Sequence, residues 1–307
     1  MSTSGTTTFN LDLNNLVEEA FERCGSQLRS GYDLRTARRS LNLLTIEWAN
    51  RGINLWTIEQ GQVNMVTGQG LYPIPNDTID LLDTVIRQNN GSSSNQIDIN
   101  ISRISESTYS TIPNKLTTGR PIQVWINRQS AQTNPTTVLL AASISSTDTS
   151  ITVDDSSLLA SGGFIKIGTE TIGYANVVGN TLTNCYRGQN GTTAAAHTVG
   201  AAVSVQNLNS INVWPTPDAG GGPYTFIYWR MRRLQDAGNG TTEQDIPFRL
   251  LPCMVAGLAF YMGQKIPEAQ PRLQFLKSEY EEQWLMASTE DREKAPVRFV
   301  PRSLFYS

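Results

Sequence analysis

Side chains that could carry out catalysis are few in this chain of 307 residues. The single histidine, His197, follows three alanines, and neither a cysteine nor a cluster of aspartates lies near it at the spacing of a metal site. No nucleophile elbow, phosphate-binding loop or dinucleotide-binding glycine motif is present. We interpret His197 as a structural or exposed residue, because a lone imidazole is rarely a ligand or a base.

Paired carboxylates occur twice. Asp154-Asp155 stands at the end of a predicted strand, before two serines, where it could cap a turn or bind calcium. Calcium requires six or more oxygen ligands, and this pattern offers few, so we favour the role in a turn. Glu281-Glu282 lies on the exposed side of the last predicted helix, and we interpret it as solvated. The sequence therefore predicts no enzyme activity, catalytic residue, cofactor or metal ion.

Arginines form two clusters that could contact a partner. The first lies on a predicted helix, on the side away from its leucines, and the second ends an aromatic strand. The residues are Arg35, Arg38 and Arg39, and Arg230, Arg232 and Arg233. Each cluster could form ion pairs between subunits or meet DNA phosphates. We favour subunit contacts, because a net charge of −3 argues against sustained binding to DNA.

The composition sets further limits. Charged residues make up only 17%, and such a surface is compatible with extensive protein contacts. The longest apolar run, 250–262, is interrupted by proline and glycine and is shorter than the roughly 20 residues of a membrane span. We expect no transmembrane segment and no secretory signal, synthesis in the cytoplasm, and three reduced cysteines, two of them at apolar helical positions.

Helical periodicity is found at both ends of the chain. Apolar residues three or four apart predict helices over 13–24 and 34–48, which should pack as an antiparallel pair. Their predicted caps and stops are Asp12, Asp33, Gly25 and Gly52. The same spacing predicts helices over 251–262 and 273–287. Pro252 either starts or kinks the first of these.

A period of two predicts strands between the helical ends. The predicted strands lie within 56–72 and at 84–87, 97–101, 122–127, 211–214 and 224–231. Single helical turns are expected at 78–82 and 105–109. The last two strands flank a loop of prolines and glycines, so we expect a hairpin that pairs with the strand at 122–127. The fold class is therefore α+β, a helical host with a small antiparallel sheet.

Residues 134–206 interrupt this host with a helix-free stretch of Thr, Ser, Gly and Val. We predict an inserted all-β domain, sandwich- or barrel-like, between host segments 1–133 and 207–293. If the flanking strands pair, the domain enters and leaves the host through adjacent strands.

Residues 294–307 combine prolines, which prevent a regular helix, with aromatic residues and three cations. We predict an extended C-terminal arm that docks on a partner. Its docking residues would be Arg298, Phe299, Pro301, Arg302, Leu304, Phe305 and Tyr306.

Short motifs follow one another along the host. They are Tyr72-Pro73-Ile74-Pro75, Arg103-Ile104-Ser105, Ile112-Pro113-Asn114-Lys115, Gly119-Arg120-Pro121, Trp214-Pro215-Thr216-Pro217-Asp218, Tyr228-Trp229-Arg230-Met231-Arg232-Arg233-Leu234-Gln235-Asp236 and Glu290-Asp291-Arg292. Together they resemble the head-to-tail adaptor proteins of short-tailed and related tailed phages. The insert resembles a small β-module found in many phage tail proteins, on the segments Ser150-Ile151-Thr152-Val153, Gly163-Phe164-Ile165-Lys166-Ile167-Gly168, Glu170-Thr171-Ile172-Gly173-Tyr174 and Arg187-Gly188-Gln189-Asn190-Gly191-Thr192.

This resemblance implies a structural virion protein at the head-tail junction. It implies a non-enzymatic homo-oligomeric ring, typically of twelve copies, between the portal protein and the tail nozzle or tail tube. The helices would line the channel through which packaged DNA passes without specific binding, and the C-terminal arm would reach into the portal. A cyclic assembly suits heterologous interfaces, in which one face of a subunit meets a different face of the next.

Two other functions are weighed against the adaptor. The first is a tail-associated component that binds a receptor or glycan through the inserted β-domain. The second is a cell-wall hydrolase carried on the tail, which a single histidine and the lack of a convergent carboxylate pair disfavour.

Overall fold

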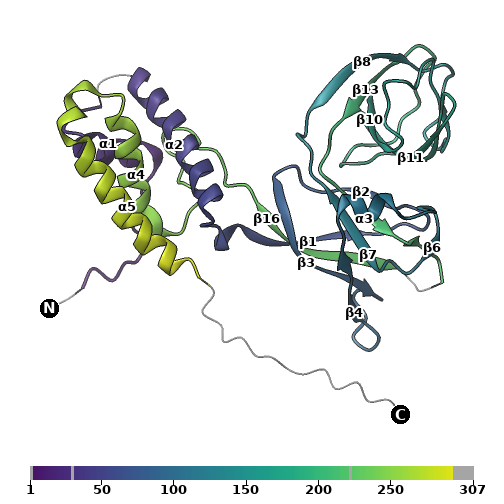
Figure 1. The fold of residues 1–307 in the computed structure, drawn as a ribbon, viewed down its shortest axis with the longest axis horizontal. Coiled ribbons are helices and arrows are strands. Elements are labelled where there is room, and N and C mark those ends of the chain that lie inside the picture. The colour runs from purple at the N-terminus through teal and green to yellow at the C-terminus, as the bar shows by residue number, and fades with distance from the viewer. Residues whose placement is uncertain (1–2, 29–30, 221–222, 293–307) are drawn as a thin grey trace. The chain divides into compact units, whose positions relative to one another are not determined.

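A computed structural model describes residues 3–28, 31–220 and 223–292. These residues form a mixed α+β fold with five α-helices and several antiparallel sheets (Figure 1). They divide into two compact units. Unit 1 contains the described residues up to Thr57 and from Arg233 onward, and unit 2 contains Ile58–Arg232.

Unit 1 is helical. Its α-helices are α1 (Leu13–Arg23), α2 (Gly31–Arg51), α4 (Leu251–Gly263) and α5 (Leu273–Glu290). Short 3₁₀ helices are η1 (Leu55–Thr57), η2 (Phe248–Leu250) and η3 (Pro267–Arg272). All four helices that the periodicity predicts are thus confirmed. Pro252 lies in the first turn of α4, so it starts that helix and does not kink it.

The ends of α1 follow from local chemistry. Asp12 caps the helix, because its Oδ1 accepts the backbone N–H of Asn15 at 2.8 Å. Gly25 ends the helix with φ +74°, a left-handed conformation that glycine adopts readily. The prediction of Asp33 as an N-cap is wrong, because α2 begins earlier, at Gly31. Asp33 instead lies in the first helical turn, where its carboxylate interacts favourably with the positive end of the helix dipole.

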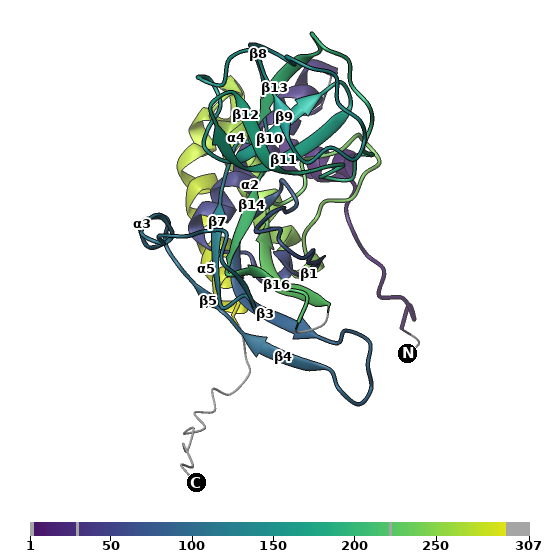
Figure 2. The ribbon, with the colours of Figure 1, turned by 90° about the vertical axis from the view of Figure 1, so that its right-hand side faces the viewer.

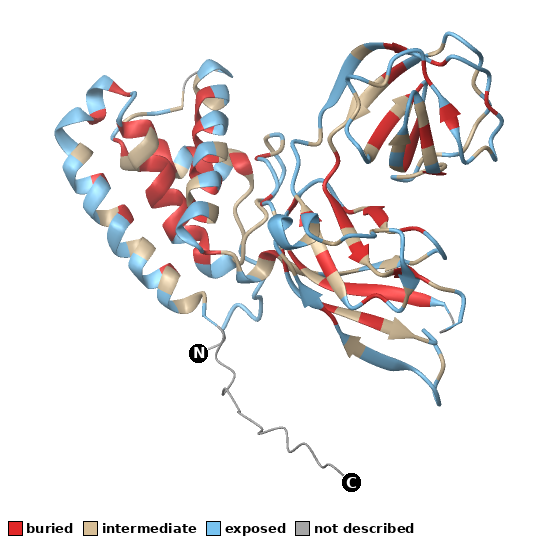
Figure 3. Ribbon diagram, turned by 45° about the vertical axis from the view of Figure 1, so that its right-hand side comes forward, coloured by how far each residue is buried: buried red, intermediate tan, exposed pale blue. Residues whose placement is uncertain are grey.

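Helix α4 forms the centre of the core of unit 1. Ten of its residues are buried, and Figure 3 shows it as a nearly continuous buried segment. Both α1 and α2 contact α4 more extensively than they contact each other, so the antiparallel pair predicted for them is secondary to this packing. Gly257 permits the close approach, because a Cβ there would lie 2.9 Å from side-chain carbons of both Leu44 and Tyr280.

Unit 2 contains two four-stranded sheets that share one apolar core. In spatial order, the first is formed by β1 (Ile58–Asn64), β16 (Tyr224–Arg232), β3 (Thr78–Gln88) and β4 (Ile97–Asn100). The second is formed by β2 (Leu71–Pro73), β14 (Ser210–Trp214), β7 (Gln123–Asn127) and β5 (Ser102–Arg103). The small pair β6 (Thr118–Gly119) and β15 (Thr216–Pro217) and helix α3 (Glu106–Ser110) complete this part.

Two sequence predictions for these sheets are wrong. Residues 78–82 form no helical turn but the start of the long strand β3, because Thr78 and Leu81 are buried in its pairing with β16. Strands β14 and β16 also form no hairpin, since they belong to different sheets. The predicted pairing of β14 with the strand at 122–127 is confirmed, with Ser210 opposite Asn127.

Residues 133–206 supply every strand of a six-stranded antiparallel sheet. Its order is β8 (Thr133–Leu139), β13 (Ala202–Gln206), β10 (Gly163–Ile167), β11 (Glu170–Val178), β12 (Thr181–Tyr186) and β9 (Ile151–Thr152). A bridge between Leu140 and Val153 joins the two edge strands, so the sheet closes on itself. Figure 2 shows these strands wound around a common interior, and their buried apolar residues form a core of their own.

Candidate functional site

The exposed face of α2 combines apolar residues with arginines. Tyr32, Leu43 and Ile46 are 63%, 54% and 44% exposed. Together with Arg35 and Arg39, both exposed, they are spaced three or four residues apart and therefore lie along one stripe of the helix. We call these five residues the α2 outer stripe. Tyrosine and arginine beside large aliphatic side chains are the composition typical of protein interfaces.

The predicted arginine cluster on α2 is only partly available to a partner. Arg38 is exposed, but its Nε donates to the carbonyl of Ala237 at 2.9 Å within unit 1. Arg39 donates to Thr36 Oγ1 at 3.3 Å on its own helix. Arg35 is exposed and forms no hydrogen bond or ion pair with another described residue, so its guanidinium is free to contact a partner.

A second surface of unit 1 is an apolar groove with an acidic edge. It has a volume of about 780 Å³ and lies along α1 and the start of α4. Its apolar lining is Phe9, Leu11, Phe248, Leu251, Pro252 and Val255. Its rim includes Glu18 and Glu22, both exposed, and no ion pair between described residues involves either. We call this surface the acidic groove.

The second arginine cluster, at the end of β16, stabilises the fold. Arg230 is 8% exposed and forms ion pairs with Asp77 at 2.6 Å and Glu59 at 3.0 Å. Arg232 also pairs with Glu59. Only Arg233 is exposed, and it pairs with Asp236 at 2.7 Å. The guanidinium groups of Arg230 and Arg232 thus connect the strands of unit 2 to one another.

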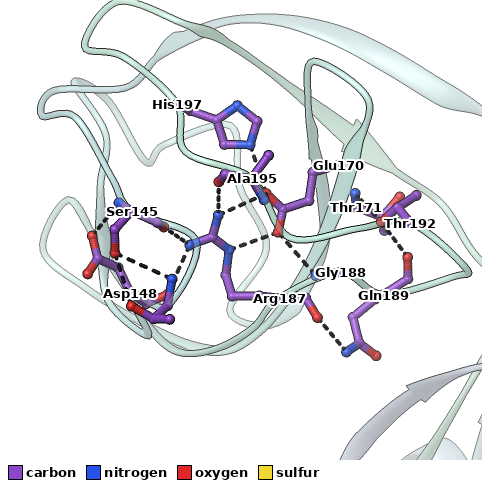
Figure 4. A network of polar contacts seen from close by, with 11 residues as sticks. Ser145, Asp148, Glu170, Thr171, Arg187, Gly188, Gln189, Thr192, Ala195 and His197 are labelled. Atoms are coloured by element: carbon purple, nitrogen blue, oxygen red, sulfur yellow. Dashed lines mark hydrogen bonds and ion pairs between the residues drawn. The ribbon is translucent and has the colours of Figure 1, made fainter.

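A network of polar contacts surrounds Glu170 inside the closed sheet of unit 2 (Figure 4). The fully buried carboxylate pairs at two points with Arg187, with Oε1 2.9 Å from Nε and Oε2 2.8 Å from Nη2. It also accepts the backbone N–H groups of Gly188 and Ala195, each at 3.1 Å. The Nε2 atom of His197 lies 2.8 Å from Oε2.

Arg187 extends this network to a neighbouring turn. Its guanidinium donates to the carbonyl oxygens of Ser145, Asp148 and Ala195. Burial alone would raise the pKa of Glu170, but the hydrogen bonds from Arg187, His197 and the two amides lower it to about 2. The network therefore keeps the carboxylate charged at neutral pH, and the charged group fixes the segment from Arg187 to His197 on strand β11.

This arrangement explains the one histidine of the chain. The side chain of His197 is 11% exposed, so it is a structural residue and not a freely exposed one. The sequence does carry a signal for its partner. The period-two alternation that places Ile172 and Tyr174 inside also places Glu170 inside, and a buried carboxylate requires a cation. Arg187, which follows Glu170 in the same closed sheet, is the cation that pairs with it.

The paired aspartates and the cysteines have structural roles in the fold. Asp155 accepts the backbone N–H of Ser157 at 2.8 Å within a turn. Asp154 accepts the backbone N–H of Leu139 at 2.8 Å, and this bond ties it to strand β8. Within the described ranges no group of carboxylates, histidines or cysteines is arranged to hold a metal ion. Cys24, Cys185 and Cys253 are reduced and buried. Burial raises the pKa of all three thiols, to about 11 for Cys24.

A pocket in unit 2 is lined by aromatic rings. It has a volume of about 330 Å³. Tyr109 stacks on Trp125 with centroids 5.0 Å apart, and the Nζ of Lys115 lies 5.4 Å from the Tyr109 ring centre. Phe164 and Tyr186, from the closed sheet, line the same pocket. Its neutral amide groups come from Asn127, Gln129, Gln206, Asn207 and Asn212.

Neither a family model nor a curated protein matches this sequence. The proposed function therefore depends on the resemblance of the motifs and on the surfaces described above. None of the described helices is long and apolar enough to span a membrane. The predicted docking arm, residues 294–307, lies outside the described residues, and so its seven candidate contact residues have no structural account.

Proposed function

We propose that this chain is a structural virion protein that assembles into a head-to-tail adaptor ring. The ring would join the portal to the tail nozzle or tail tube and surround the channel for DNA. The observation that carries this proposal is the α2 outer stripe, in which Tyr32, Leu43 and Ile46 are exposed beside two arginines. Such a surface is stabilised by another protein, because water solvates its apolar residues poorly.

The arrangement of unit 2 supports a host that carries an inserted β-domain. The chain leaves the host at strand β7 and returns at β14, and these strands pair directly. Inside the closed sheet, the first and last strands also pair, with Thr133 opposite Gln206. An element that begins and ends at neighbouring points can be added to a fold without separating its strands. In the proposed ring this domain decorates the host.

A non-enzymatic role agrees with how the reactive groups are used. Glu170 is held as an anion by four donors besides His197, and the three cysteines are buried thiols whose raised pKa disfavours the thiolate. Of the six predicted arginine contacts, we assign the role at subunit contacts or the DNA channel to Arg35 and Arg39. Transient, unspecific contact with DNA suits two arginines on a protein with net charge −3.

The proposal is tested by the mass and the image of the purified full chain, alone and with the portal protein of the same phage. We expect a ring, either alone or assembled on the portal. Removal of residues 294–307 should leave the ring-forming unit folded and abolish its binding to the portal. A full chain that stays monomeric in both conditions would contradict the adaptor, and unchanged portal binding after the truncation would contradict the docking arm.

A tail-associated glycan-binding component is a second candidate, favoured by the aromatic pocket of unit 2. Sugars stack their C–H faces on aromatic rings and exchange hydrogen bonds with amides, and the pocket supplies both. Particles whose chain lacks residues 136–205 should then assemble normally and fail only in adsorption to cells. The change Trp125→Ala should weaken adsorption in the same way, whereas normal adsorption of both variants would exclude this function.

A further inference from the structure

The two apolar surfaces of unit 1 have opposite charge. The α2 outer stripe carries Arg35 and Arg39, and the acidic groove carries Glu18 and Glu22. We propose that the α2 outer stripe of one copy binds in the acidic groove of the next copy, head to tail. This inference rests on the proposed ring and names the two surfaces that would build it.

The two surfaces complement each other both in their apolar side chains and in their charges. Leu43 and Ile46 offer exposed aliphatic groups, and Phe9 and Phe248, 77% and 70% exposed, offer apolar groups in the groove. Burying these four side chains against one another removes apolar surface from water, which drives association. The arginines and glutamates then fix the orientation, because like charges brought together at this contact would repel.

The contact has to form between copies. The opposite side of α2, with Ala37, Leu41, Leu44 and Trp48, is fully buried in the core of unit 1. The outer stripe therefore points away from the unit to which it belongs and cannot reach the groove of its own chain. A contact between two different surfaces of identical subunits is heterologous, and it closes into a ring when the rotation per subunit is suitable.

The α2 outer stripe and the acidic groove have compatible dimensions. The stripe spans the residues from Tyr32 to Ile46, roughly 20 Å along an α-helix. The groove follows α1 from Asn15 to Arg23 and continues over Phe248 of η2 to the start of α4. Its volume of about 780 Å³ is large enough to take several side chains of a helix that lies along it.

A charge exchange tests the contact in the full chain. The first variant combines Arg35→Glu with Arg39→Glu, and the second combines Glu18→Arg with Glu22→Arg. We expect each variant alone to assemble at least ~100-fold more weakly than the wild-type chain, because like charges then face each other. A mixture of the two should assemble again, with alternating copies, because each reversed surface meets its complement. Mass measurement of the three samples reads out the result.

Photo-crosslinking provides an assay that does not depend on charge. A photoreactive side chain at Leu43 should form adducts with the groove of another copy, at Phe9, Phe248 or α1. The control position is Leu158, which is 56% exposed in a turn between β9 and β10 and should give no adduct with the groove. Adducts from Leu43 to other surfaces, or to residues 294–307, would overturn the proposed contact.

The outcomes separate this inference from the proposed function. If the wild-type chain forms a ring and both charge variants assemble equally well, the interface is wrong and the adaptor remains. If the two variants are defective but the mixture does not recover, the stripe and the groove do not meet, and the inference is overturned. A wild-type chain that remains monomeric both alone and with the portal would overturn the contact together with the adaptor.

Discussion

Glu170 and Arg187 form a two-point ion pair inside the closed sheet of unit 2, with distances of 2.9 and 2.8 Å. Their side chains are 0% and 7% exposed. Because the same carboxylate binds the amides of Gly188 and Ala195, the pair connects strand β11 to the segment that follows β12. A buried pair of this kind determines which conformation the segment adopts, and removal of either partner leaves an uncompensated charge.

The change Glu170→Gln should destabilise the closed sheet by about 3–5 kcal/mol, because it leaves the Arg187 guanidinium buried without a counter-ion. Hydrogen exchange of amides in β10 and β11 measures this locally, and faster exchange is expected in both strands. The matched control is Asp98→Asn, which breaks the more exposed pair with Arg87 and should cost about 1 kcal/mol or less. Equal effects of the two changes would show that the buried pair stabilises the fold no more than the exposed pair does.

The stability of the closed sheet should fall in acid. The ordinary pKa of a glutamate is 4.5, and that of Glu170 in the fold is about 2. A carboxyl whose folded pKa is depressed contributes its full stabilisation above the unfolded value and loses it as pH falls through the folded value. We therefore expect roughly 3 kcal/mol to be lost between pH 4.5 and pH 2.

Urea unfolding across that pH range, followed by hydrogen exchange in β10 and β11, measures this loss. The Glu170→Gln variant provides the control, because it lacks the titrating group. Its pH dependence should be shallower than that of the wild-type chain. Parallel pH profiles for the two proteins would mean that other carboxylates govern acid unfolding.

Close helix packing in unit 1 should make Gly257 intolerant of a side chain. The change Gly257→Ala places a Cβ 2.9 Å from side-chain carbons of Leu44 and Tyr280, so these buried side chains must shift, at about 1–3 kcal/mol. Gly31→Ala in α2 is the matched control, because no atom lies within 4 Å of its added Cβ. Alanine favours a helix over glycine, so this control should be neutral or slightly stabilising. Thermal unfolding of both variants distinguishes packing from helix propensity.

The sequence predicted the elements whose signal is local. The helix over 13–24 follows from apolar spacing, from Asp12 as its cap and from Gly25 as its stop, all of which act within a few residues. A turn at Asn190-Gly191 also has a local origin, because both residues adopt a positive φ, which this dipeptide accommodates readily. Such features require no knowledge of the rest of the chain.

Features that depend on distant partners were mispredicted or missed. Strands β14 and β16 lie close together in sequence, but β16 pairs with β1 and β3, so the predicted hairpin is wrong. Arg230 reads from the sequence as a partner contact, and only the fold brings Asp77 and Glu59 to it. The acidic groove could not be predicted from the sequence either. Phe9 and Phe248 are 239 positions apart and line the same groove only after α1 and α4 have packed.

The two arginine clusters should respond in opposite ways to substitution. Arg230→Ala removes a guanidinium that is about 10% exposed. Asp77 then keeps no ion pair with a described residue, whereas Glu59 keeps its pair with Arg232. Because these carboxylates are 46% and 43% exposed and can be hydrated, we expect a moderate loss of about 1–2 kcal/mol. Self-association measured well below the unfolding temperature should stay unchanged.

The matched change Arg35→Ala should do the reverse. Its side chain is exposed on the α2 outer stripe, so the free energy of unfolding should change by less than about 0.5 kcal/mol, while self-association weakens. Measuring thermal unfolding and mass for both variants separates the two roles. If Arg35→Ala destabilised the fold and Arg230→Ala only weakened assembly, the division between structural and partner-binding arginines would have to be reversed.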